Sequence, residues 1–179
     1  MFDFEDTPLE GLKRVAPKMR PDARGWFVKL FHAPSFAEAG LCTEYREQYC
    51  SMSHRNVLRG MHFQTPPHDH AKLVYCLSGR VLDVALDLRR ASPTYGQSFS
   101  AELDGSASHG IYFPRGFAHG FLTLSDEAVL SYHVETPYAP EHDTGVRWDS
   151  FGFDWPVTEP LVSPRDAGFG GLADFQSPF

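Results

Sequence analysis

Short runs of β-branched and aromatic residues, interrupted by Gly, Pro, Ser and Asp, dominate the hydrophobic pattern of this chain. Such runs at regular short intervals are typical of a β-sandwich or β-barrel. The clearest hairpin joins residues 73–77 to 80–88 through Ser78-Gly79. Only residues 34–40 resemble a helix, a short one ended by Gly40. The pattern predicts an all-β fold with strands at 25–31, 43–52, 57–63, 71–77, 80–88, 97–103, 109–113, 119–124 and 127–135.

Length and composition narrow the class of protein. A chain of 179 residues is expected to form one domain with a full core. A net charge of −7 without a basic stripe argues against a nucleic-acid partner. No apolar run approaches the roughly 18 residues of a membrane span, so no membrane partner is expected. The acidic N-terminus and three cysteines favour a cytoplasmic location. The Gly-rich stretch predicts a flexible tail over 167–179.

Three ionisable residues fall on predicted strands beside residues typical of a core. Strand side chains alternate between faces, so neighbouring strands can direct such groups into one cavity. His62 fits a general base and Lys72 can stabilise an oxyanion. Tyr132 can donate a phenolic proton. Each residue also has a purely structural interpretation: His62 as a core histidine, Lys72 as an exposed strand lysine and Tyr132 as a core tyrosine.

Other residues suit a nucleotide ligand. The planar guanidinium of Arg59 can donate two parallel hydrogen bonds to a diphosphate. The imidazole of His119 can become a cation by protonation. Tyr138, near Pro137 and Pro140, can stack on a nucleobase, although turn aromatics often only pack against the protein.

A metal site is the competing interpretation of the histidines. His68-Asp69-His70 gives an H-x-H pattern, and a Gly- and Pro-containing segment ends at His119. The carboxylate expected shortly after H-x-H is missing, and Lys72 occupies that region. An ammonium repels a divalent cation and offers it no lone pair. The sequence therefore favours a site without metal.

The ordered motifs resemble the dTDP-4-dehydrorhamnose 3,5-epimerase family, which comprises metal-free cupins of deoxysugar biosynthesis. The resemblance covers residues 8–166 and implies a cupin-type jelly-roll. Its motifs are Asp22-Ala23-Arg24-Gly25, Val57–Gln64, Lys72-Leu73-Val74, Asp87-Leu88-Arg89, Ser92–Gly96, Pro114–Phe121, Tyr138–Glu141, Trp148, Trp155-Pro156 and Ser163–Asp166.

The resemblance implies a nucleotide-diphospho-4-keto-6-deoxyhexose substrate and no cofactor. In such a sugar the C3 and C5 protons are both α to the C4 ketone. By resemblance, His62 is the base. Asp166 orients the His62 ring and favours its charged form. Lys72 stabilises the enolate oxygen, and Tyr132 supplies the proton from the opposite face.

The resemblance also implies the binding residues and the assembly. Arg59 and His119 would hold the diphosphate or sugar, Tyr138 would stack on the base, and Asp83 would orient a histidine. The family implies a homodimer that exchanges N-terminal strands, which lie here within residues 1–53. The remaining substrate-binding positions are Arg24, Lys29, Glu47, Tyr49, Gln64 and Arg165.

The chain departs from the family at positions that would bind the nucleotide. Lys29 stands where the family has Glu, which reverses the charge. Glu47 and Tyr49 stand in place of a Gln-x-Asn pair, whose amide donors and acceptors they cannot reproduce. Asp149-Ser150 replaces the usual Asp-Pro. The proposed catalytic residues are unchanged, so the nucleotide, the sugar and the choice of C3, C5 or both stay open.

Three alternatives follow. The first keeps the fold and makes the chain a 3,4-ketoisomerase or a C3- or C5-only epimerase on another nucleotide sugar. The second is a metal-dependent cupin dioxygenase or isomerase using His62, His68, His70 and His119. The third is a nucleotide-sugar binding module without catalysis.

Overall fold

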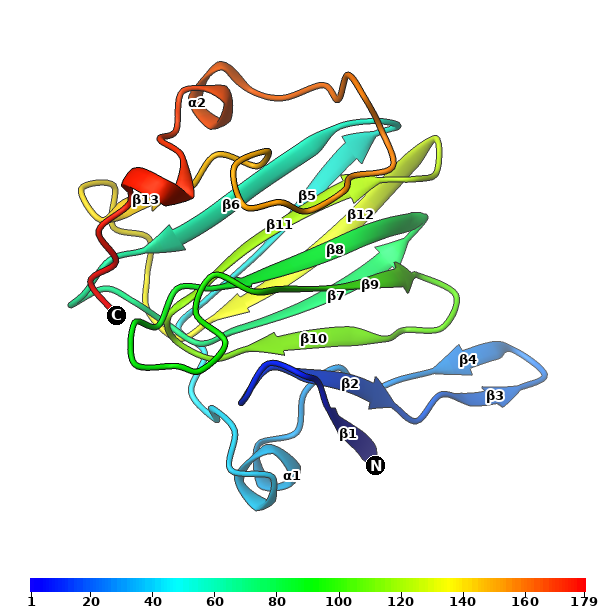
Figure 1. The fold of residues 1–179 in the computed structure, drawn as a ribbon. Coiled ribbons are helices and arrows are strands. Elements are labelled where there is room, and N and C mark those ends of the chain that lie inside the picture. Colours follow the sequence, from blue (N-terminus) through cyan, green and yellow to red (C-terminus); the bar gives the residue numbers. More distant parts are fainter.

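Two β-sheets lie face to face in the computed structural model, which describes residues 1–179 (Figure 1). The six-stranded sheet runs β1 (Phe2–Asp6), β2 (Lys13–Pro17), β10 (Gly110–Phe113), β7 (Lys72–Ser78), β12 (Glu127–Val134) and β5 (Glu47–His54). The five-stranded sheet runs β13 (Asp143–Gly145), β6 (Leu58–Gln64), β11 (Phe117–Thr123), β8 (Arg80–Asp87) and β9 (Ser98–Asp104). Neighbouring strands in both sheets are antiparallel.

The remaining elements are short. A separate hairpin pairs β3 (Arg20–Asp22) with β4 (Gly25–Phe27). The helices are α1 (Ala33–Glu38), α2 (Pro164–Ala167) and a 3₁₀ turn, η1 (Leu172–Asp174). None of these helices is long and apolar enough to cross a membrane. The architecture confirms the predicted all-β, jelly-roll class with few short helices.

Each predicted strand corresponds to an observed one, whereas β1, β2, β3 and β13 were not predicted. Their sequences are rich in charged residues or very short, so they carry little β-pattern of their own. They become strands because an existing sheet edge or hairpin partner supplies backbone hydrogen bonds. The predicted strand 25–31 is shorter than expected, since β4 ends at Phe27, where its partner β3 also begins.

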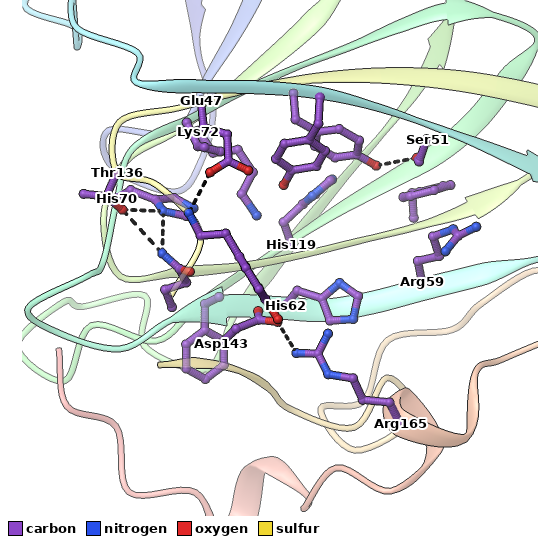
Figure 2. A pocket seen from close by; sticks show the side chains of 17 residues that line it. Glu47, Ser51, Arg59, His62, His70, Lys72, His119, Thr136, Asp143 and Arg165 are labelled. Carbon is purple, nitrogen blue, oxygen red and sulfur yellow. Dashed lines mark hydrogen bonds and ion pairs between the residues drawn. The ribbon is translucent and has the colours of Figure 1, made fainter. Parts of the chain in front are cut away.

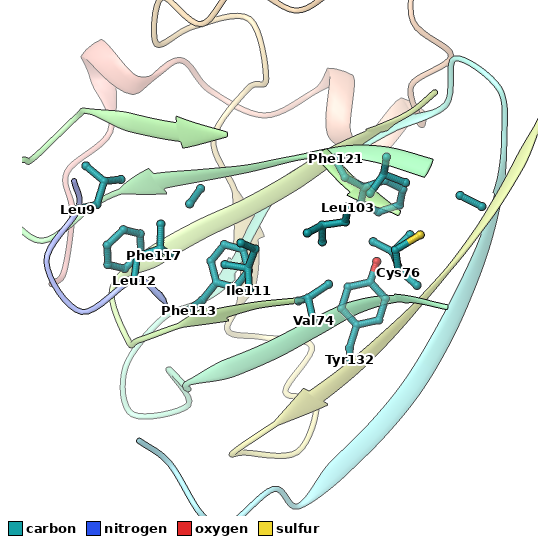
Figure 3. Packing of buried hydrophobic residues seen from close by; sticks show 14 residues of the cluster. Leu9, Leu12, Val74, Cys76, Leu103, Ile111, Phe113, Phe117, Phe121 and Tyr132 are labelled. Carbon is teal, nitrogen blue, oxygen red and sulfur yellow. The ribbon is translucent and has the colours of Figure 1, made fainter. Parts of the chain in front are cut away.

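The space between the sheets is divided between an apolar core and a cavity. A cluster of 14 buried residues fills the apolar part, with Val74, Phe121 and Leu130 among its members (Figure 3). These residues come from strands of both sheets and share the inward-facing positions that strand alternation sets. The same strands also carry the inward-facing polar residues that line the cavity. The packed core therefore holds the cavity walls in place.

The C-terminal segment, for which the sequence predicts a flexible tail over 167–179, packs against the outer face of the five-stranded sheet. Phe175 and Phe179 lie with their rings 5.3 and 5.8 Å from that of Phe63. The hydroxyl of buried Ser177 donates to the Leu88 carbonyl. The glycine-rich composition concealed these aromatic anchors, which bury apolar surface that the sheet would otherwise expose.

Two glycines let β6 and β11 approach closely at the edge of the cavity. A Cβ on Gly60 would lie 2.5 Å from the Cα of Gly120. Arg59 pairs with Phe121, and His62 pairs with His119, so β6 has one residue more than β11 between these pairs. Such a bulge re-aims side chains. It allows Arg59 and His62, three positions apart, to line the same cavity.

Candidate active site

A cavity of about 330 Å³ opens between the sheets (Figure 2). Its walls come from β5, β6, β7, β11, β12 and β13, together with α2, which carries Arg165, and the loop that carries Tyr138. Most of the predicted site residues line it: Glu47, Tyr49, Arg59, His62, Gln64, Lys72, His119, Tyr132, Tyr138 and Arg165. Segments far apart in the sequence are therefore brought together as the spacing predicted.

His62 is paired with a buried carboxylate. Asp166 sits on α2, whose first turn is capped when Ser163 Oγ accepts from the Asp166 backbone N–H. The ring Nε2 of His62 lies 2.8 Å from Asp166 Oδ1, and Gly60 N–H donates to Oδ2 at 3.1 Å. A proton on Nε2 leaves Nδ1 with a free lone pair, as a general base requires.

The ionisation of Asp166 follows from its partners. Burial raises its pKa, but the hydrogen bond and charge of His62, with smaller contributions from Gly60 and Ser163, outweigh burial and leave the pKa below its usual value. Asp166 is therefore a carboxylate at neutral pH. An anion at this distance stabilises the imidazolium that forms when His62 accepts a proton.

Lys72 is a buried cation on the opposite sheet. Its side chain points inward from β7 and is only 8% exposed. Burial lowers the pKa of Lys72 to about 8, and the attraction of Asp143 and Asp83 opposes that decrease. The ammonium form therefore still prevails at pH 7. A cation held in a dry site interacts strongly with a developing negative charge.

Tyr132 projects into the cavity from β12. Its hydroxyl lies 3.2 Å from Ser51 Oγ on the adjacent strand β5. Burial raises the pKa of Tyr132 above its ordinary value, although the hydrogen bond to Ser51 opposes this. The phenol is therefore protonated at neutral pH and has a proton to give.

His119 lies in the cavity, but its environment differs from the expected switchable cation. Its Nε2 is 2.8 Å from Asp83 Oδ2, and both side chains are almost fully buried. Burial, with smaller contributions from the charges of Lys72 and His62, lowers the pKa of His119, although the charge and hydrogen bond of Asp83 oppose this. A neutral imidazole can hydrogen-bond a ligand but adds little charge toward a diphosphate. Asp83 meets the expectation that it contacts a histidine.

Two of the predicted binding residues hold the loop at the cavity mouth. Glu47 Oε2 accepts from the backbone N–H of Tyr138 at 2.7 Å. Gln64 accepts from Ala139 N–H at 2.7 Å and donates to the His68 carbonyl at 2.8 Å. The ring of Tyr138 is 60% exposed, so it is available for stacking on a ligand.

The two arginines of the cavity have different surroundings. Arg59 donates to Ser53 Oγ at 2.9 Å and to the Met52 carbonyl at 3.3 Å, without a carboxylate partner. Its charge is therefore free for an anionic ligand. Arg165 instead lies 2.6 Å from Asp143 Oδ2, so its charge is already partly matched.

Other cavity residues were not predicted from the sequence. His70 entered the sequence analysis only through the metal-dependent alternative, yet it lines the cavity and contacts Gln64 and Thr136. Burial, and then the charge of Lys72, lowers the pKa of His70 to about 3. The sequence held a weak signal for Asp143, which follows the Tyr138 motif closely. The full set of additional lining residues is Ser51, Phe63, His70, Phe121, Val134, Thr136 and Asp143.

Arg24 and Lys29 are the predicted binding residues that do not line the cavity. Arg24 is fully exposed and pairs with Asp22 in the turn of the β3–β4 hairpin. Lys29 follows β4 and is also exposed. The hairpin projects from the body of the molecule, as Figure 1 shows. That Arg24 and Lys29 bind the substrate, partly across a dimer interface, therefore stays a prediction.

The histidines do not form a metal-binding group. No cluster of three or more His, Cys, Asp or Glu side chains is arranged to hold a metal ion. His62 and His119 are each engaged by an aspartate, and His68 packs against His142 with ring centres 4.5 Å apart. The geometry thus gives no support to the metal-dependent alternative.

The jelly-roll and the ionisable groups inside it define a cupin-type enzyme of the isomerase class. The model of the dTDP-4-dehydrorhamnose 3,5-epimerase family matches residues 6–174, and the chain belongs to that family. The dTDP-4-dehydrorhamnose 3,5-epimerase of Methanothermobacter thermautotrophicus is 39% identical, with 97% of this chain and 96% of the relative covered.

Two further relatives bear on the substrate and the reacting centres. A dTDP-6-deoxy-D-glucose-3,5-epimerase from Legionella pneumophila, solved in complex with dTDP-4-keto-L-rhamnose, superposes with a TM-score of 0.93 at 34% identity, covering 98% of this chain and 95% of its own. The dTDP-4-dehydrorhamnose 3-epimerase of Streptomyces niveus is 40% identical over 88% of this chain and 78% of the relative.

Proposed function

We propose that this protein epimerises a nucleotide-diphospho-4-keto-6-deoxyhexose at C3, C5 or both, with dTDP as the first nucleotide to test. The observation that carries the proposal is the position of the proton-transfer groups on opposing walls. His62 projects from β6 of one sheet and Tyr132 from β12 of the other. A sugar ring held between the sheets would meet a base on one face and an acid on the other.

The residues supply each proton and charge of the reaction. His62 Nδ1 removes the proton from the carbon next to the C4 ketone, and the electron pair moves to the C4 oxygen. The Lys72 ammonium stabilises that oxyanion. Tyr132 then donates its hydroxyl proton to the opposite face of the carbon, and the C4 ketone is restored with the centre inverted. Exchange with water returns both side chains to their starting states.

The nucleotide would lie at the mouth of the cavity. We propose that Arg59 binds the diphosphate through its free guanidinium donors and that the exposed ring of Tyr138 stacks on the base. Glu47 would act indirectly, by fixing the backbone of Tyr138.

We further propose a homodimer in which the N-terminal strands are exchanged. The β3–β4 hairpin carries Trp26 and Phe27, which are 58% and 59% exposed. Large apolar rings are seldom left so accessible without a partner. In a dimer this hairpin would bring Arg24 and Lys29 to the cavity mouth of a second copy. The dimer and the cytoplasmic location are predictions from the sequence.

A panel of substrates tests the proposed function. The protein would be incubated in D₂O with 4-keto-6-deoxyhexoses carrying dTDP, CDP or GDP, and label at C3 and C5 would be followed by NMR. We expect deuterium at one or both carbons with at least one nucleotide. Absence of label from all three sugars would refute the epimerase and support a binding module.

The same panel separates the single-centre alternative. Label and inversion confined to C3 would match the activity in the name of the Streptomyces niveus relative. Transfer of the keto group from C4 to C3 would instead identify a 3,4-ketoisomerase.

A further inference from the structure

Tyr49 is the aromatic partner of the proposed proton donor. It lies directly opposite Tyr132 in the antiparallel pairing of β5 with β12. The two rings are stacked, with centroids 4.7 Å apart and an interplanar angle of 15°. Tyr49 is 42% exposed and Tyr132 only 6%, so Tyr49 is the solvent-side ring of the pair. Both rings line the cavity.

The contacts of Tyr132 leave its ring little freedom. Tyr49 lies against one face, the His119 ring approaches at 6.1 Å in an edge-on arrangement, and Ser51 contacts the hydroxyl. An aromatic side chain has two rotatable bonds, and stacking limits both of them. Tyr49 therefore restricts where the Tyr132 hydroxyl can lie.

The position of that hydroxyl matters because a 4-keto sugar offers two carbons. C3 and C5 flank the C4 ketone, and a single phenol must approach each of them to protonate both. A change in the tilt of the ring brings the hydroxyl closer to one carbon and farther from the other. Proton transfer depends steeply on such distances.

Resting on the proposed function, we propose that Tyr49 is a positioning residue that fixes the Tyr132 ring and thereby sets how reprotonation is divided between C3 and C5. The asparagine usual at this position in the family has no ring to stack. This chain thus has a constraint on its proton donor that an amide cannot provide.

The experiment compares Tyr49→Asn with Tyr49→Phe and uses the sugar that is active in the substrate panel. Initial rates of inverted, deuterium-labelled product are measured at C3 and at C5. We expect the ratio of the two rates to change at least about tenfold in Tyr49→Asn, because an ångström-scale misplacement can cost roughly 10²-fold. In Tyr49→Phe, which keeps the stacked ring, the ratio should stay at the wild-type value.

The ratio separates positioning from a structural role, since a smaller folded fraction or weaker binding lowers both rates together. Tyr95→Asn is the matched control, because Tyr95 is also exposed and lies outside the cavity. It should leave both rates unchanged. If the wild type inverts one carbon only, Tyr49→Asn should invert both.

Three results would overturn the inference. If the ratio of the C3 and C5 rates is unchanged in Tyr49→Asn, Tyr49 contributes only to binding or packing. A changed ratio in Tyr49→Phe would assign the effect to the hydroxyl instead of the ring. A wild type that inverts one carbon, with Tyr49→Asn inverting the same carbon alone, would also refute it. Failure of the proposed function differs from these, since the wild type would then incorporate no label.

Discussion

Replacement of His62 by alanine should lower the rate of deuterium entry into the active 4-keto sugar by about 10³-fold, within the range of a lost general base. The imidazole is the only group in the cavity paired with the Asp166 carboxylate, at 2.8 Å. Without it, β6 offers the cavity only Arg59, Phe63 and Gln64, none of which can accept the proton near neutral pH. The NMR exchange assay measures the effect directly.

The controls for His62 exclude a general loss of folding. His109→Ala changes an exposed histidine outside the cavity and should exchange label at the wild-type rate. The unfolding temperature of His62→Ala, which should fall because buried Asp166 loses its partner, shows whether the variant is folded at the assay temperature. Exchange within tenfold of the wild type in folded His62→Ala would remove His62 as the base.

Replacement of Lys72 by methionine should lower kcat by about 10²- to 10³-fold, the usual cost of losing one oxyanion-stabilising group. Methionine keeps much of the buried stem and removes the charge. Lys18→Met, at an exposed position, serves as the control and should retain full activity. A kcat for Lys72→Met equal to that of the wild type would show that the enolate charge is stabilised elsewhere.

The pH dependence of the wild type provides a second measurement on Lys72. Its pKa is lowered to about 8, and the reaction requires the ammonium form. The ammonium is present below that pKa and is lost as the pH rises through it. We therefore expect kcat/KM to fall above pH about 8. A profile flat from pH 7 to 10 would contradict the proposed role of the ammonium.

The sequence predicted the strands of the barrel well, because each is an apolar run bounded by turn residues. It failed for β1 and β2, whose charged residues become strands only when β10 offers an edge. It also gave no sign of the packing in the tail, where aromatic rings spaced among glycines contact Phe63. Such contacts depend on which surfaces are adjacent after folding, and local pattern does not contain that information.

The site residues that fall within family motifs could be predicted from the sequence, whereas the others could not. His62, Lys72 and Tyr132 fall at inward strand positions, so alternation and family motifs agreed. The burial of His70 depends on a loop that folds back through Gln64 and Thr136, which no periodicity reveals. The neutral state of His119 likewise follows from its burial, which outweighs the charge of Asp83.

The stacking of Tyr49 on Tyr132 depends on strand register, which the sequence alone does not reveal. The departure at position 49 was visible in the sequence as a lost amide, which suggested a changed nucleotide site. Only the pairing of β5 with β12 places the new ring on the proposed proton donor. The same substitution thus bears on the reacting carbons as well as on the nucleotide.

The central claim is that base and acid act from opposite sheets on opposite faces of the sugar. Tyr132→Phe tests it most directly, because this variant keeps the ring and removes only the donated proton. In D₂O, solvent-accessible His62 should still exchange the substrate proton, so label should enter with retained configuration. Inverted product should fall by about 10²-fold or more. Inversion at the wild-type rate in Tyr132→Phe would contradict the two-face account.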